Sequence, residues 1–161
     1  MTSTLAAVLL SAIAPASACG ANETDVFSGQ VEDDLGLDLS VCVAGDEGEP
    51  DAAITIRWSG EGGSDSVSCR AGECEGVIEY ARYTRPRFTI VTLAWAKDGA
   101  IQRLTQSFDA QGETPKASVS HIWTSQNADL GSVESFPVRT GASDLESVSY
   151  THLTLPTIYS V

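Results

Sequence analysis

One short segment of this chain combines arginines with a tyrosine, which is the clearest binding chemistry in the sequence. Arg82, Tyr83, Arg85 and Arg87 lie close together in a chain with only 9 basic residues against 22 acidic ones. A guanidinium binds a carboxylate or sulfate through paired hydrogen bonds, and aromatic rings stack on sugar rings or on guanidinium groups. These four residues are therefore the candidate ligand-binding residues of the sequence, for a carboxylate, sulfate or sugar acid. The interpretation that we favour at this point is that the arginines pair with the protein's own acidic residues where one strand turns into the next.

Catalytic chemistry has less support in the sequence. His121 is the only histidine before the last fourteen residues, and alternation along its predicted strand places it on the face of Val119 and Trp123. A nucleophile–base pair needs a serine or cysteine delivered to the imidazole, and no Gly-x-Ser-x-Gly elbow singles one out. We therefore predict no catalytic residue and no cofactor, and interpret His121 as a structural or exposed residue.

Two groups of residues could hold a metal ion. The acidic clusters Asp33-Asp34 and Asp46–Asp51 offer carboxylate oxygens, and calcium takes about six to eight such ligands. Neither cluster follows the spaced Asp-x-Asp-x-Asp-Gly pattern of a calcium loop. Cys69 and Cys74 lack the second cysteine or histidine pair that a zinc site requires. The sequence therefore predicts no metal site.

The chain has four cysteines: Cys19, Cys42, Cys69 and Cys74. In an exported protein cysteines form disulfides by default, because the compartment is oxidising. Cys69 and Cys74 enclose four residues including a glycine, which favours a short loop closed by a disulfide. Cys19 with Cys42 would complete the set, although four cysteines permit three pairings.

Export is predicted by the first eighteen residues, Met1–Ala18, which contain no charged side chain. Leu5–Ala14 is an apolar run far shorter than the roughly 20 residues of a spanning helix, so we predict a signal peptide and no transmembrane segment. Pro15 ends the run, and Ala16-Ser17-Ala18 supplies the small-x-small pattern of a cleavage site. No Lys or Arg precedes the apolar run, from which we expect the true start to lie upstream. The alternative to a signal peptide is a buried N-terminal helix. We expect a periplasmic or secreted protein.

Cys19 lies directly after the predicted cleavage site, where a cysteine can carry a lipid instead of forming a disulfide. A cysteine in this position is the lipid-modified first residue of bacterial lipoproteins, whose signal usually carries leucine three residues earlier. Ala16 stands there instead. We therefore favour a plain cleavage over a lipid anchor at Cys19.

The last fourteen residues differ in character from the rest. Residues 148–161 contain no Asp, Glu, Lys or Arg, and the run Val148–Thr157 resembles the translation of a transposase adapter used to build sequencing libraries. The resemblance implies that the natural gene is interrupted near Ser147 and that residues 148–161 are a non-native tail. The alternative is a genuine apolar terminal strand.

Residues 19–147 then form one domain that carries all of the charged residues and the net charge of −13. Such a charge disfavours nucleic acids and anionic membranes, both of which need a basic surface. It suits a cationic protein partner, or simply solubility.

Alternating apolar residues predict strands nearly throughout this domain. The predicted strands are Val26–Glu32, Leu37–Val43, Ile54–Trp58, Val77–Tyr83, Phe88–Trp95, Ile101–Phe108 and Ala117–Trp123. Lys97-Asp98-Gly99 marks a tight hairpin between two of them. Turn-rich stretches, among them 59–65, separate the others. We predict an all-β fold, a small antiparallel β-sandwich or barrel.

Residues 26–109 resemble small secreted bacterial β proteins of uncharacterised activity, which open with Phe-Ser-Cys and continue to Ser-Val-Cys. Ser40-Val41-Cys42 keeps the second motif, whereas Phe27-Ser28-Gly29 lacks the first cysteine. The resemblance implies that the usual partner of Cys42 is absent, so that Cys19 replaces it or Cys42 is free. It implies no activity.

These observations favour an exported, acidic, non-catalytic β domain that binds an unidentified ligand. An inhibitor of a secreted cationic enzyme such as lysozyme is the alternative, because opposite charges speed encounter. A hydrolase is the third interpretation, with His121 as its only candidate base.

Overall fold

The computed structural model describes residues 18–32, 36–46, 49, 51–97, 99–109, 116–123, 133–143, 145 and 148, with the backbone alone at 121–123, 133–134 and 140–143. Nine strands account for most of these residues. They are β1 (Glu23–Val31), β2 (Asp38–Ala44), β3 (Ala53–Gly60), β4 (Gly63–Arg70), β5 (Ile78–Arg85), β6 (Phe88–Lys97), β7 (Ala100–Asp109), β8 (Lys116–Trp123) and β9 (Val133–Ser143). The expected all-β class is confirmed.

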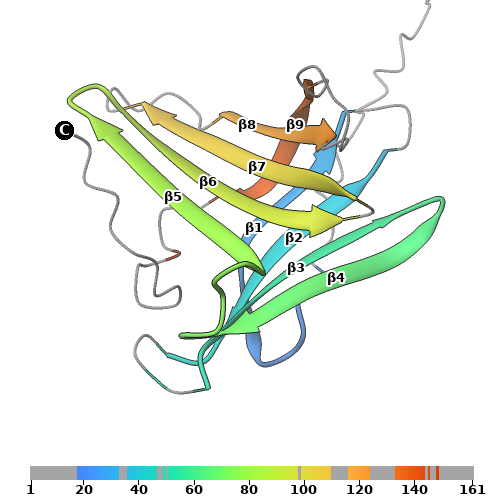
Figure 1. Cartoon of the computed structure of the whole chain (residues 1–161), viewed down its shortest axis with the longest axis vertical. Helices are drawn as coiled ribbons and strands as arrows, with labels where there is room; N and C mark the ends of the chain where they lie inside the picture. Colours follow the sequence, from blue (N-terminus) through green and yellow to red (C-terminus); the bar gives the residue numbers. More distant parts are fainter. Residues whose placement is uncertain are drawn as a thin grey trace, which may run out of the picture.

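The strands form one curled antiparallel sheet in the order β4-β3-β2-β1-β9-β8-β7-β6-β5. Pairing of β1 with β9 joins the β1–β4 half to the β5–β9 half. The two edge strands, β4 and β5, are consecutive in the chain and diverge from the loop that connects them (Figure 1). The result is a half-barrel, which agrees with the predicted sandwich or barrel.

The interior follows directly from the alternation in the sequence. Val41 of β2 lies opposite Ile56 of β3, and both are fully buried. Their neighbours along the strands point to the outer face. Trp58 of β3 and Trp95 of β6 stack with ring centroids 6.0 Å apart, which connects the two halves of the sheet across the interior.

Two strands were not predicted. β4 contains Val67 as its only β-branched residue, and the sequence of residues 59–65 favoured a turn. The turn is in fact limited to residues 61–62, because the ladder between β3 and β4 continues to Gly60 opposite Gly63. An edge strand of this kind is held by backbone hydrogen bonds and needs little side-chain burial.

β9 is the second strand that the sequence did not reveal. It contains Pro137, which interrupts a strand pattern and is unusual away from sheet edges. The Pro137 carbonyl nevertheless accepts a hydrogen bond of 2.8 Å from Glu32 N. The other seven strands correspond to the predicted ones.

The chain continues past β9 into the interior. Leu145 and Val148 are fully buried in the core, and Leu145 N donates a hydrogen bond of 3.1 Å to Oε1 of the buried Gln106. Val148 is the first residue of the segment that resembles an adapter, so the core includes one residue of that segment. Residues 149–161 lie outside the described part of the chain.

Candidate functional site

The tip of the β5–β6 hairpin gathers an aromatic and cationic cluster. Arg85 lies opposite Phe88, and the turn between them contains only Pro86 and Arg87. The Arg85 guanidinium carbon lies 5.1 Å from the centre of the Tyr83 ring, and its Nε donates a hydrogen bond to the Tyr83 hydroxyl. The Tyr83 and Phe88 ring centroids are 6.2 Å apart. Tyr83 and Phe88 are 38% and 40% exposed, so this cluster offers apolar surface to a partner.

The four predicted residues do not all share one face. Arg82 lies opposite Val91, which is fully buried, so strand alternation places Arg82 on the interior side of the sheet. Tyr83 and Arg85 are on the outer side, and Arg87 is in the turn. Arg85 and Arg87 form no ion pair with the described residues. The hairpin cluster is therefore Tyr83, Arg85, Arg87 and Phe88; sequence reasoning missed Phe88 as a site residue because the register of the turn is not visible in the sequence.

The opposite end of β5 is acidic. The loop between β2 and β3 and the loop between β4 and β5 lie side by side there, since Ala71 N donates a hydrogen bond of 2.8 Å to the Ala52 carbonyl. The described acidic residues of these loops are all exposed: Asp46, Glu49, Asp51, Glu73 and Glu75. Charge is thus segregated along β5, with acidic loops at its start and the hairpin cluster at its end.

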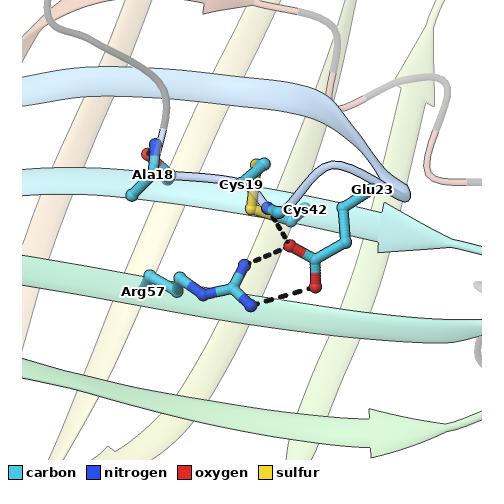
Figure 2. Close-up of polar contacts among 7 residues, drawn as sticks. Ala18, Cys19, Glu23, Cys42 and Arg57 are labelled. Carbon is cyan, nitrogen blue, oxygen red and sulfur yellow. Dashed lines mark hydrogen bonds and ion pairs between the residues drawn. A yellow bond between two sulfur atoms is a disulfide. The ribbon is translucent and has the colours of Figure 1, made fainter.

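A second cluster fixes the N-terminal segment to the outer face of the sheet (Figure 2). Cys19 is disulfide-bonded to Cys42 of β2. The Glu23 carboxylate accepts hydrogen bonds from both terminal nitrogens of Arg57, at 2.5 and 3.0 Å, and from Gly20 N at 2.6 Å. These contacts form an N-terminal clamp of Cys19, Gly20, Glu23, Cys42 and Arg57.

The pairing in the clamp shifts two pKa values in opposite directions. The hydrogen bonds from Arg57 lower the pKa of Glu23, outweighing the effect of partial burial. The same bonds raise the pKa of Arg57. Both groups are therefore charged throughout the neutral range. Sequence reasoning missed this pair because its members are 34 residues apart and share no local pattern.

The clamp borders a groove of about 460 Å³ that is lined by residues of β2, β3 and β4. The groove is lined by Ala18, Asp38, Ser40, Arg57, Trp58, Ser59, Ser64, Asp65 and Ser66. Serine and aspartate predominate in this lining. No residue of the groove was among the predicted site residues.

The remaining chemistry of the described residues is sparse. Cys19 and Cys42 lie close to Glu23, but they are joined in a disulfide, so their sulfurs are not free thiolates that could hold a metal ion. Cys69 and Cys74 form the second disulfide. The acidic cluster at 33–34 lies outside the described residues, and that at 46–51 is described only at Asp46, Glu49 and Asp51. The backbone register places His121 between Gln102 of β7 and Glu134 of β9, whereas the His121 side chain lies outside the described residues.

No family model, curated protein or solved structure matches the chain. Within the described ranges, no helix has the length and apolar character needed to cross a membrane.

Proposed function

We propose that this protein is an exported, non-catalytic binding domain and that the hairpin cluster is its contact surface for an anionic ligand. The observation that carries the proposal is the exposure of Tyr83 and Phe88 beside an arginine that stacks on Tyr83. The stacking and the hydrogen bond hold the guanidinium in place before a ligand arrives. An arginine positioned in this way loses less conformational entropy on binding a carboxylate.

Export is supported by the two disulfides, which belong to an oxidising compartment. The apolar run before the predicted cleavage site is the signal that would direct the chain to export. The disulfide also bears on the lipid alternative, because a Cys19 sulfur bonded to Cys42 cannot carry a thioether-linked lipid at the same time. We therefore favour a free periplasmic or secreted domain.

The proposal is tested by titrating the purified chain with hexagalacturonate, which combines carboxylates with sugar rings, and with a neutral galactose hexamer. We expect Arg85→Ala and Tyr83→Ala each to weaken binding of the acidic oligomer by about tenfold, the loss of one charge-assisted or stacking contact. The matched control is Arg70→Ala, which removes one exposed positive charge at the acidic end. If Arg70→Ala weakens binding as much as Arg85→Ala, or if the neutral oligomer binds equally well, the hairpin cluster is not the contact surface.

The second candidate function is inhibition of a secreted cationic enzyme such as lysozyme, and the acidic loops at the start of β5 favour it. The five acidic residues that the structure describes in the two adjacent loops are exposed and would attract a basic surface. The two functions separate experimentally. Salt-sensitive inhibition of lysozyme that survives Tyr83→Ala but is lost in the double variant Glu73→Gln/Glu75→Gln would favour the inhibitor.

A further inference from the structure

The outer face of β5, β6, β7 and β8 continues from the hairpin cluster across four adjacent strands (Figure 1). The register sets Tyr83 of β5 beside Ile90 of β6. Ile90 lies beside Ser107 of β7, and Ser107 lies beside Lys116 of β8. Directly paired residues share a face, so this Tyr83 row lies on the outer side together with Tyr83. Neighbouring strands are about 4.8 Å apart, which separates the backbone of Tyr83 from that of Lys116 by roughly 14 Å.

The middle of this face has no acidic side chain. The row beside the Tyr83 row consists of Ala81, Thr92, Thr105 and Ser118. The hydroxyls of Thr92 and Thr105 are 3.4 Å apart and form a hydrogen bond. The two rows together contain Lys116 and no Asp or Glu, in a chain with 22 acidic residues and a net charge of −13. The carboxylates Glu79 and Asp109 lie in the two rows that flank them, so the middle of the face bears hydroxyls and little charge.

The cations near the two ends of the Tyr83 row have no carboxylate partner among the described residues. Lys116 is exposed and forms no ion pair there, although Asp109 lies diagonally across from it on the same face. Arg85 is exposed as well, and its guanidinium engages Tyr83 and not an acid. The arginine of the N-terminal clamp, by contrast, is neutralised by a carboxylate. Exposed cations without such partners give this face a local positive potential, which favours an anionic ligand.

We infer that the ligand of the hairpin cluster is an extended acidic polysaccharide that crosses the outer face along the Tyr83 row, from Arg85 to Lys116. The inference rests on the proposed function and adds to it the length and the course of the ligand.

The length follows from the spacing of the two cations. A single sugar acid held at Arg85 is too short to reach Lys116, which lies roughly 14 Å away across the strands. A chain of sugar acids places a further carboxylate at Lys116. Its intermediate units carry hydroxyls, which match the serine and threonine hydroxyls between the two cations because both kinds of group donate and accept hydrogen bonds. A nucleic acid suits the face less well, because the acidic remainder of the protein repels its phosphates.

The test compares galacturonic acid with hexagalacturonate as probes, by calorimetry and by amide chemical shifts of the disulfide-bonded chain. We expect the hexamer, and not the monomer, to shift the amides of Ser107 and Lys116. Lys116→Ala should weaken binding of the hexamer by about fivefold, the loss of one exposed charge contact, and should leave binding of the monomer unchanged. Arg85→Ala should weaken both. Arg103→Ala is the matched control, because it removes an exposed cation from the same face, in the row of Glu79 and away from the Tyr83 row.

Each outcome decides the inference. An effect of Lys116→Ala that is confined to the hexamer, with no effect of Arg103→Ala, supports it. If Arg85→Ala weakens binding of the hexamer and Lys116→Ala does not, the proposed function stands and the extended ligand is overturned. If Arg85→Ala changes binding of neither probe, the proposed function itself fails and the inference fails with it. Equal effects of Lys116→Ala and Arg103→Ala would reduce the interaction to net charge, and equally tight binding of a linear polyphosphate would overturn the assignment to a polysaccharide.

Discussion

Glu23 connects the parts of the N-terminal clamp. Its carboxylate accepts hydrogen bonds from Gly20 N, next to Cys19 in the chain, and from both terminal nitrogens of Arg57. Two charge-assisted hydrogen bonds join this carboxylate to one guanidinium. An ion pair with this geometry contributes more to the stability of the fold than an isolated surface pair does. The side chains of Arg57 and Glu23 are 30% and 16% exposed, so solvent still screens the interaction.

The lowered pKa of Glu23 gives a pH dependence with a definite sign. Its stabilisation is present above the ordinary pKa of a glutamate and is lost as the pH falls through the lowered pKa in the folded state. We expect Glu23→Gln to reduce the free energy of unfolding by about 1 kcal/mol at neutral pH and to have little effect in strong acid. Urea titrations at several pH values measure this difference.

Glu49→Gln is the control for that experiment, since Glu49 is exposed on an acidic loop. It should change stability little at any pH. A Glu23→Gln difference that is equally large at neutral and strongly acidic pH would contradict the assignment of the effect to the charged carboxylate.

At the scale of elements, the contact between β1 and β9 joins the two halves of the sheet. Gly29 of β1 is fitted tightly there: a Cβ atom at this position would lie 2.4 Å from Val138 Cγ1 and 3.0 Å from the Arg139 carbonyl oxygen. The carbonyl belongs to the backbone and cannot rotate away. Only the absence of a side chain allows the strands to approach this closely.

Gly29→Ala should therefore destabilise the fold by about 1–3 kcal/mol, the cost of overpacking. Gly62→Ala is the matched control, because a Cβ at Gly62 would have no atom within 4 Å. Thermal unfolding of the two variants compares them directly. Equal melting temperatures for both variants would show that β1 and β9 are not packed as described.

The elements also show how far a sequence can predict this fold. Leu39, Val41 and Ile56 alternate with polar neighbours, so their strands and the buried face follow from periodicity alone. β4 escaped prediction because its stability comes from a ladder with β3, and such pairing leaves no apolar pattern. β9 escaped because Pro137 interrupts it locally, although both of its neighbours are strands.

The candidate sites were less predictable than the strands. The arginines near Tyr83 could be found in the sequence because basic residues are rare in this chain. Only the register of the hairpin shows that Arg82 and Arg85 lie on opposite faces of the sheet and that Phe88 lies beside Arg85. The groove is formed by rows that run across β2, β3 and β4. Residues in such a row are far apart in the sequence, and no local pattern connects them.

At the scale of the whole molecule, the two disulfides and the separation of acidic loops from the hairpin cluster support the same interpretation. Cys69–Cys74 closes the loop between the edge strands, and Cys19–Cys42 attaches the N-terminal segment to the outer face of the sheet. The acidic loops and the hairpin cluster occupy opposite ends of β5. This arrangement suits a small domain that keeps its fold outside the cell and presents different chemistry at its two ends.

The central claim, an exported domain clamped at Cys19, is tested most directly by the intact mass of the chain recovered from outside the cytoplasm after expression with its full N-terminus. We expect a chain that begins at Cys19, carries no lipid, and gains the mass of four hydrogens on reduction of its two disulfides. A chain that retains residues 1–18, a lipid-modified Cys19, or a mass unchanged by reduction would contradict it.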